Sequence, residues 1–264
     1  MLRKSTLVVL LFAVVSLAFA AAPAFTASPV ATNSLGLPVY RVAVGDIEMG
    51  YAVTGKGSPL VLLTGLACTV EHWPPEVVET LSRAFTVILL DNRGMGYSTD
   101  TGEPFSYELL SEDVVGFLRA IGIEKADFLG YSMGSIFIQY LLLHYPQLVD
   151  RAVLHATALD SAGILHSLEQ FANAPLPTSG PVKRQLDIVD DWHASASDFQ
   201  SVENQVLLIV GTADPIVDPE DSSLLAQILP GSWLVRFPGN THYLMFENPV
   251  DFADVLFGFL THGR

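Results

Sequence analysis

The pentapeptide Gly130-Tyr131-Ser132-Met133-Gly134 carries the strongest chemical signal in the sequence, because it matches the pattern G-x-S-x-G. It follows an apolar run that ends in Phe128 and Leu129, and it precedes apolar residues at helical spacing. A sharp turn from strand to helix exposes the serine hydroxyl, and the flanking glycines allow the two elements to pack closely. We therefore predict that Ser132 is a catalytic nucleophile.

A serine hydroxyl is a weak nucleophile and needs a base, which in turn needs an orienting acid. After a G-x-S-x-G serine the acid comes first and the histidine second. His242 lies just beyond the last expected strand, and it is the best placed of the seven histidines. Asp214 follows the apolar run 206–211 and would hold the histidine tautomer. Asp218 and Asp160 remain alternatives for the acid.

An acyl-transfer site also needs backbone donors for the oxyanion. The N–H of Met133 opens the helix after the nucleophile. The second donor is expected in the loop Thr64-Gly65-Leu66-Ala67-Cys68, which follows the first expected parallel strand. We assign the N–H of Leu66 to this role, with Gly65 allowing the backbone to turn.

Strand-forming and helix-forming segments alternate along most of the chain. Residues 39–44 and 47–53 alternate apolar and polar side chains around Gly45-Asp46, which predicts a β-hairpin. Apolar runs predict strands at 60–63, 85–90, 126–130, 151–155, 206–210 and 234–237. Helices are expected at 74–84, after the N-cap Ser106, at 133–144, at 221–229 and after the N-cap Asn248. This alternation predicts an α/β fold with a mostly parallel central sheet and helices on both faces.

The stretch from Ala156 to Gln205 interrupts the alternation. Apolar residues at 164, 165, 168 and 171 have the spacing of an amphipathic helix, and those at 182, 186 and 189 indicate a second helix. The segment Ala174–Pro181 between them holds three prolines and a glycine, which is typical of a loop. We predict a short helical lid, residues 156–205, over one end of the sheet.

The composition excludes several functions. The chain of 264 residues has 28 acidic and 13 basic side chains, and its net charge is −15. Such a surface repels phosphate backbones, so nucleic acid is not an expected partner. Because Cys68 is the one cysteine, the chain can form neither an internal disulfide nor a Cys-rich zinc site. No obligate protein partner is evident, and the oligomeric state stays open.

The N-terminal residues have the pattern of a targeting segment. Arg3 and Lys4 precede an apolar stretch, residues 7–20, that ends in the A-x-A site Ala18-Phe19-Ala20. Residues 1–20 are therefore predicted to be a signal peptide, cleaved after Ala20 or Ala22. The uncharged stretch 21–38 is expected to be a linker before a domain at 39–264. The expected location is secreted or periplasmic, with an N-terminal membrane anchor as the alternative.

Four motifs in this order resemble the α/β-hydrolase fold superfamily, and within it the small esterases, enol-lactonases and cofactor-free perhydrolases. They are Asp91–Ser98, the turn at Ser132, Gly211–Asp214 and Gly239–His242, and the resemblance spans about residues 40–260. Two features differ from the family. Thr64-Gly65 stands where the family usually has His-Gly, which implies altered support of the oxyanion loop. The lid is short, which implies an open site or a shallow pocket.

We expect an exported serine hydrolase that cleaves small carboxylic esters or lactones through an acyl-enzyme, without a metal or an organic cofactor. One alternative is a cofactor-free perhydrolase or haloperoxidase, in which peroxide replaces water. A different class is a non-catalytic ligand-binding protein on the same scaffold, but intact Ser132, Asp214 and His242 argue against it. The short, charged lid favours an esterase for short acyl chains over a lipase activated at interfaces.

Overall fold

The computed structural model describes residues 28–172 and 174–264. The predicted signal peptide, residues 1–20, and the first part of the predicted linker lie outside these ranges. Within them, every helix is too short or too polar to cross a lipid bilayer.

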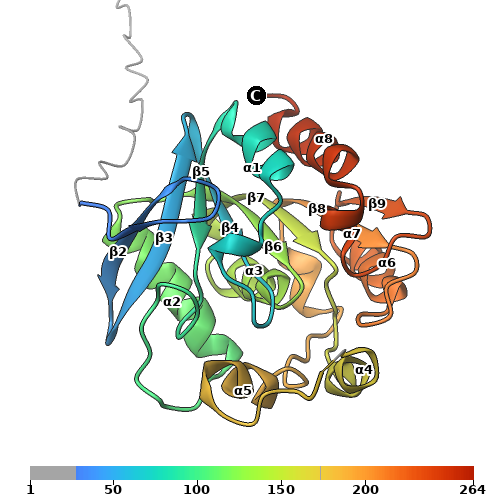
Figure 1. The fold of residues 1–264 in the computed structure, drawn as a ribbon. Helices are drawn as coiled ribbons and strands as arrows, with labels where there is room; N and C mark the ends of the chain where they lie inside the picture. Colours follow the sequence, from blue (N-terminus) through green and yellow to red (C-terminus); the bar gives the residue numbers. More distant parts are fainter. Residues whose placement is uncertain (1–27, 173) are drawn as a thin grey trace, which may run out of the picture.

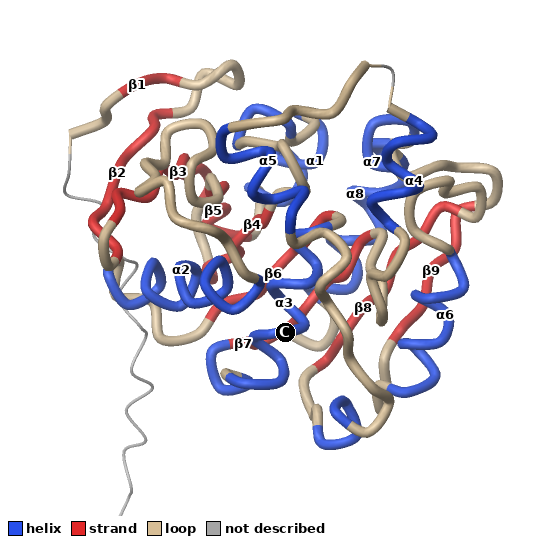
Figure 2. The backbone as a smooth tube through the Cα atoms, turned by 90° about the horizontal axis from the view of Figure 1, so that it is seen from below, coloured by secondary structure: helices blue, strands red, loops and turns tan. Residues whose placement is uncertain are grey.

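A β-sheet in the order β1-β2-β3-β5-β4-β6-β7-β8-β9 forms the centre of the described chain (Figure 1 and Figure 2). The strands are β1 Ala31–Thr32, β2 Pro38–Val44, β3 Ile47–Gly55, β4 Ser58–Leu63, β5 Phe85–Leu90, β6 Ala126–Tyr131, β7 Val149–His155, β8 Gln205–Gly211 and β9 Trp233–Phe237. The pairs from β1 to β5 are antiparallel, whereas the pairs from β5 to β9 are parallel. The predicted fold class is confirmed.

Helices cover both faces of this sheet. The α-helices of the described residues are α1 Pro75–Ser82, α2 Tyr107–Ala120, α3 Met133–His144, α4 Ile164–Phe171, α5 Gly180–Asp187, α6 Pro219–Ile228, α7 Leu244–Glu247 and α8 Pro249–Thr261. Helices α1 and α8 pack side by side on one face, and α2 and α3 pack on the other (Figure 1).

The central strands are apolar throughout because they are buried on both faces. Successive side chains of a strand point to opposite faces. Leu60 and Leu62 of β4 therefore join the apolar core beside α1 and α8, whereas Val61 and Leu63 join the core beside α2 and α3. A strand covered on both sides reads as a continuous apolar run, which is why these strands could be predicted.

The sheet includes residues that precede the predicted domain boundary at Val39. Ala31 and Thr32 form β1, an edge strand that pairs with Val39 and Pro38 of β2. The Asn33 side chain makes this turn possible, because its Oδ1 accepts hydrogen bonds from the N–H groups of Leu35 (3.1 Å) and Leu37 (2.8 Å). The prediction of a linker over 21–38 is therefore wrong for this last part.

Two of the predicted helix caps can be compared with the structure. Ser106 caps α2, since its Oγ accepts a hydrogen bond from Leu109 N at 3.0 Å. Asn248 does precede α8, but its side chain makes no capping hydrogen bond within the described chain. The preceding helix α7, which was not predicted, already places Asn248 N on the carbonyl of Leu244 at 2.8 Å.

The predicted lid contains α4 and α5, which lie away from the sheet at the lower edge of Figure 1. Its two ends are joined at the base: Asp160 and His193 form an antiparallel bridge, and Ala194 N donates to Leu159 O at 3.1 Å. From α3, the buried Gln139 donates to Ala158 O at 2.8 Å and accepts from Trp192 Nε1 at 3.2 Å. The base of the lid is thus fixed to the domain on both sides.

Candidate active site

Ser132 occupies the sharp turn between β6 and α3, with φ 52° and ψ −120°. A positive φ is uncommon for a residue with a side chain and marks a strained backbone, a feature that often occurs at functional sites. The glycines on either side are required by close packing. A Cβ at Gly134 would lie 2.2 Å from the carbonyl oxygen of Leu63, and one at Gly130 would lie 2.5 Å from that of Gly134. Strand β6 and helix α3 therefore approach each other closely, and the side chain of Ser132 projects from the tight turn between them.

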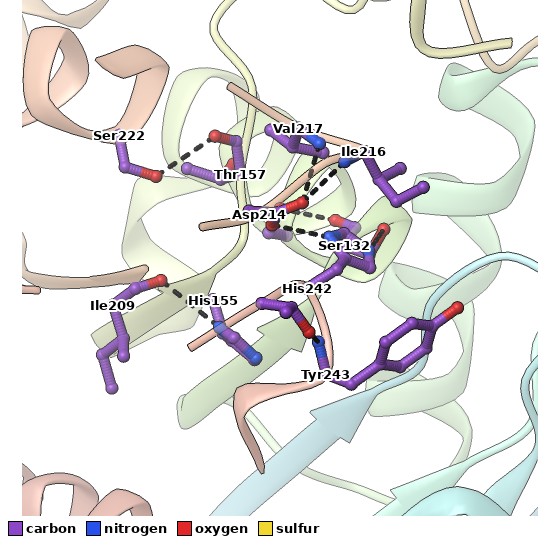
Figure 3. A network of polar contacts seen from close by, with 12 residues as sticks. Ser132, His155, Thr157, Ile209, Asp214, Ile216, Val217, Ser222, His242 and Tyr243 are labelled. Carbon is purple, nitrogen blue, oxygen red and sulfur yellow. Dashed lines mark hydrogen bonds and ion pairs between the residues drawn. The ribbon is translucent and has the colours of Figure 1, made fainter. Parts of the chain in front are cut away.

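The structure brings Ser132, His242 and Asp214 together at the ends of three strands, from segments far apart in the sequence. Ser132 Oγ lies 3.0 Å from His242 Nε2, and His242 Nδ1 lies 2.7 Å from Asp214 Oδ2 (Figure 3). Both distances are within hydrogen-bond range. The arrangement allows the serine to donate its proton to the imidazole while the carboxylate accepts from the other ring nitrogen.

Asp214 is held rigidly behind the histidine. Its side chain is fully buried, and its other oxygen, Oδ1, accepts hydrogen bonds from the N–H groups of Ile216 (2.8 Å) and Val217 (3.0 Å) (Figure 3). These two donors and the imidazole compensate the carboxylate for its loss of water. The carboxylate is thereby fixed so that it accepts a hydrogen bond from His242 Nδ1, which favours the histidine tautomer that carries its proton on that nitrogen.

The loop that carries His242 is fixed by a residue that sequence reasoning missed. Glu247 in α7 accepts hydrogen bonds from Thr241 N at 2.9 Å and from Asn240 Nδ2 at 3.0 Å. Burial by itself would raise the pKa of Glu247, but the hydrogen bonds from Thr241 and Asn240 lower it below its usual range. An ionised Glu247 therefore holds the residues that precede His242 in place.

The alternative acids take other roles. Asp218 is exposed and caps α6, where its Oδ1 accepts from Glu220 N at 2.9 Å. Asp160 is exposed at the lid base and pairs with His193 at 2.8 Å. Neither is hydrogen-bonded to His242 in the described chain.

The predicted oxyanion donors lie on either side of the serine. Leu66, Ser132 and Met133 line one cavity. Gly65 passes so close that a Cβ there would lie 3.2 Å from the Cβ of Ser132. Met133 is the first residue of α3, and the first N–H groups of a helix have no partner within it. Both predicted donor residues therefore border the cavity at Ser132.

The predicted oxyanion loop is held by side chains from other parts of the chain. Asn92 Nδ2 donates to Thr64 O at 3.2 Å. Ala67 has a positive φ of 59°, and its N–H donates to Oε1 of Gln185 in α5 at 2.8 Å. Gln185 is completely buried. Sequence reasoning missed this residue, because the two partners are 118 positions apart.

The cavity beside the serine is small and apolar. It measures about 30 Å³. Its other walls come from α2, α3, the lid and the loop after Asp214, through Tyr107, Ile136, Ala156, Ala158, Ile164, Leu168, Val189, Ile216 and Val217. The cavity is small, but it is not open, because Ile164 and Leu168 of α4 form part of its wall.

The motif Asp91–Ser98 supports the site without contacting the serine. Arg93 donates to both oxygens of the buried Asp113 at 2.7 Å, and it also donates to Asp46 at 2.8 Å. The Asp91 carboxylate accepts from Val70 N and Tyr97 N, both at 2.8 Å. Burial raises the pKa of Asp91 to about 6 in spite of these hydrogen bonds.

Cys68 is a packed side chain in this structure. Its side chain contacts the apolar core beside α1 and α8. Burial raises the pKa of the Cys68 thiol to about 11, so the thiol stays protonated at neutral pH. Because the thiolate is the reactive form, this environment gives the thiol no nucleophilic role.

Comparison with known proteins agrees with this geometry. A family model described as the alpha/beta hydrolase fold matches residues 58–179. A Mycobacterium tuberculosis protein, named provisionally as a non-heme bromoperoxidase, is 27% identical over 77% of this chain and 94% of its own. The 3-oxoadipate enol-lactonase 2 of Acinetobacter baylyi is 29% identical over 75% of this chain and 89% of its own.

Solved structures show the same architecture. An alpha/beta hydrolase fold protein from Chitinophaga pinensis superposes with a TM-score of 0.79 at 21% identity, covering 88% of this chain and all of that one. The strand order, the strained serine at the end of β6 and these similarities together lead to one assignment. The chain has the alpha/beta hydrolase fold.

Proposed function

We propose that the protein is an exported serine hydrolase that cleaves carboxylic esters or lactones through an acyl-enzyme intermediate. The observation that carries the proposal is the chain of hydrogen bonds from Ser132 through His242 to Asp214, next to a small apolar cavity. A serine is activated as a nucleophile when a base lies within hydrogen-bond reach and a third group orients that base. Both conditions are met in this arrangement.

In the first half of the reaction, Ser132 Oγ attacks the ester carbonyl and its proton passes to His242 Nε2. Asp214 stabilises the imidazolium that forms. The oxyanion of the tetrahedral intermediate accepts hydrogen bonds from the N–H groups of Leu66 and Met133. The intermediate collapses when the bond to the leaving oxygen breaks, and His242 gives its proton to the departing alcohol.

In the second half, water takes the place of the alcohol. His242 accepts a proton from this water as its oxygen attacks the acyl carbon, and the same amides hold the second oxyanion. Collapse releases the carboxylic acid and returns the proton to Ser132. In a lactone the departing alcohol stays attached to the acyl group, so one product leaves instead of two.

The test of this proposal is activity together with covalent labelling. Ser132→Ala should keep the fold and lower kcat for p-nitrophenyl butyrate by a factor on the order of 10⁴ or more. A fluorophosphonate probe should label the purified wild type at Ser132 and leave the variant unlabelled. Equal labelling of both proteins would show that the nucleophile is a different residue.

Perhydrolysis is the second candidate, and the relative named as a bromoperoxidase favours it. In that reaction hydrogen peroxide replaces water in the second half, and the acyl-enzyme gives a peracid. The two candidates are separated by comparing peracid formation from acetate and peroxide with ester hydrolysis by the same preparation. A hydrolase in the strict sense gives hydrolysis without appreciable peracid.

Export is part of the proposal and rests on the basic, apolar and A-x-A pattern of residues 1–20. N-terminal sequencing of the protein recovered from outside the cytoplasmic membrane should start at Ala21 or Pro23. An uncleaved chain found with the membrane would support the anchored alternative, and an uncleaved cytoplasmic chain would contradict export.

A further inference from the structure

A second and much larger hollow shares one lining residue with the cavity at Ser132. This outer groove measures about 680 Å³. It is lined by Ser106, Tyr107, Glu108, Tyr140, Leu143, His144, Asp191, Trp192, His193, Ala194 and Asp198. Tyr107 is the residue that lines both the outer groove and the cavity at the serine. The two hollows are therefore neighbours, and one side chain of α2 belongs to both walls.

The outer groove continues the line of the catalytic cavity along α3. Ile136 lines the cavity, and Tyr140, four residues further along α3, lines the groove. Residues four apart lie on the same face of a helix, with a rise of about 6 Å between them. On the lid side, Val189 lines the cavity and Trp192 lines the groove. An extended chain attached at Ser132 would thus run along α3 toward His144 if Tyr107 did not stand in its way.

Tyr107 separates the cavity at Ser132 from the outer groove, and its side chain is held by weak contacts. Its ring packs edge-on against Trp192 at 5.9 Å and is tilted against Phe137 at 6.2 Å. Its hydroxyl donates to Val189 O at 3.4 Å, which is long for an O–H···O hydrogen bond. Trp192 is held more firmly, since its Nε1 donates to the buried Gln139 at 3.2 Å. Of the two aromatic rings at the boundary, Tyr107 is the one that can be shortened without loosening the base of the lid.

The chemistry of the outer groove selects among possible chains. Its floor includes Tyr140, Leu143 and Trp192, which offer apolar surface. The carboxylates of Glu108, Asp191 and Asp198 lie at its exposed margin. An uncharged aliphatic chain matches this floor, whereas a chain that ends in a carboxylate meets like charges.

We propose that the outer groove is an acyl-chain subsite and that Tyr107 is the specificity-determining residue that closes it, restricting the wild type to short acyl groups. The inference rests on the proposed function, because it assumes that the acyl group is attached to Ser132. Shortening Tyr107 joins the two hollows and gives the chain an apolar path of more than one helical turn.

The experiment compares kcat/KM for p-nitrophenyl butyrate and octanoate below their solubility limits. Tyr107→Ala should raise the octanoate-to-butyrate ratio at least ~10-fold, because each added methylene contributes about 0.8 kcal/mol when it is buried. Tyr107→Leu, which keeps an apolar side chain of intermediate size, should give a smaller rise and serves if the alanine variant does not fold. Tyr107→Phe keeps the ring and should leave the ratio unchanged.

Two controls separate this effect from general loosening. Tyr140→Ala removes an aromatic side chain that lines the outer groove alone, and its ratio should stay within ~2-fold of the wild type. In Tyr107→Ala, an ester whose eight-carbon acyl chain ends in a free carboxylate should gain less than octanoate, because that end meets Glu108 and Asp191.

An unchanged ratio in folded Tyr107→Ala and Tyr107→Leu would overturn the inference while leaving the proposed function intact, provided that both still hydrolyse butyrate and label at Ser132. An equal gain for octanoate and its carboxylated analogue would also overturn the groove as the path of the chain. A wild type that neither hydrolyses butyrate nor labels at Ser132 would remove the proposed function and this inference together.

Discussion

His155 is a fully buried ionisable residue next to the candidate triad. Its ring stacks on Tyr131 with a centroid distance of 5.2 Å and packs against Phe252 at 4.9 Å. Tyr131 also packs against His242 at 5.2 Å, so one aromatic ring connects the two histidines. Burial, followed by the nearby His242, lowers the pKa of His155 to about 4. His155 is therefore neutral in the folded protein at neutral pH.

This lowered pKa predicts that His155 makes the fold sensitive to acid. In the unfolded chain His155 takes up a proton near its ordinary pKa of 6.5, whereas in the folded protein it does so near 4. The contribution of neutral His155 to the free energy of unfolding is thus fully present above about pH 6.5 and is lost as the pH falls toward 4. The wild type should lose about 3 kcal/mol more unfolding free energy than His155→Phe between pH 7.5 and 4.

The comparison with His155→Phe is essential because other buried groups act in the opposite direction. Burial raises the pKa of Asp91 and of Asp127 to about 6, so folding becomes more favourable as these carboxyls take up protons below that pH. Their effect is common to both proteins and cancels in the difference. Denaturant unfolding of the pair at several pH values measures the difference, and parallel curves would rule out His155 as its source.

At the scale of elements, α5 connects the lid with the oxyanion loop. Gln185 accepts from Ala67 N, next to the proposed donor Leu66. The neighbouring residue, Arg184, forms an ion pair with Asp100, and its guanidinium carbon lies 4.8 Å from the centre of the Phe105 ring. One short helix thus makes two different attachments, of which one reaches the oxyanion loop and the other holds the helix in place.

Gln185→Leu separates these two roles. It removes the acceptor for Ala67 N–H and leaves a strained loop without its hydrogen bond, so the Leu66 amide should move from its position. We expect kcat to fall about 10-fold with little change in KM, which is less than the loss for deleting an oxyanion donor outright. Steady-state kinetics on p-nitrophenyl butyrate measures both parameters.

Arg184→Met is the matched control on the same helix. It removes the ion pair of α5 with Asp100 and keeps the hydrogen bond between Gln185 and Ala67. Its kcat should stay within ~2-fold of the wild type. Similar losses of kcat in both variants would mean that attachment of the helix, rather than the bond to the oxyanion loop, is what matters.

The elements that could be predicted are those whose own residues determine them. Runs such as Val87–Leu90 are apolar on both sides because the strand is covered on both sides. Strand β1 has two residues, and its order depends on the turn at Asn33 and on pairing with β2, neither of which local composition reveals. Ser132, Asp214 and His242 could be located because each follows a predictable strand. Gln185 and Tyr107 could not, since their positions depend on how the lid folds back over the sheet.

At the scale of the whole molecule, the attachments of the lid oppose its opening at a lipid surface. Movement of the lid would break the bond from Ala67 to Gln185, and the bonds of Gln139 to Ala158 and Trp192 hold the lid base to α3. The net charge of −15 also repels anionic lipid. Hydrolysis should therefore favour short acyl chains and rise smoothly with substrate concentration.

Rate measurements with tributyrin across its solubility limit check this expectation. A smooth, saturating curve is expected. A sharp increase at the limit, or a preference for long-chain triglycerides, would indicate a lid that moves much further than these attachments allow.

The closed base of the lid has a consequence for how new specificities arise in this protein. Ser161 N donates to Trp192 O at 2.8 Å, so the insertion leaves and re-enters the domain at points about one strand spacing apart, ~5 Å. A segment of any length whose ends meet like those of a hairpin can occupy this position. The sheet and the triad need not change when it does. A different lid could therefore change the substrates that are accepted while the sheet and the triad stay the same, provided that it also supplies the acceptor that Gln185 gives to Ala67.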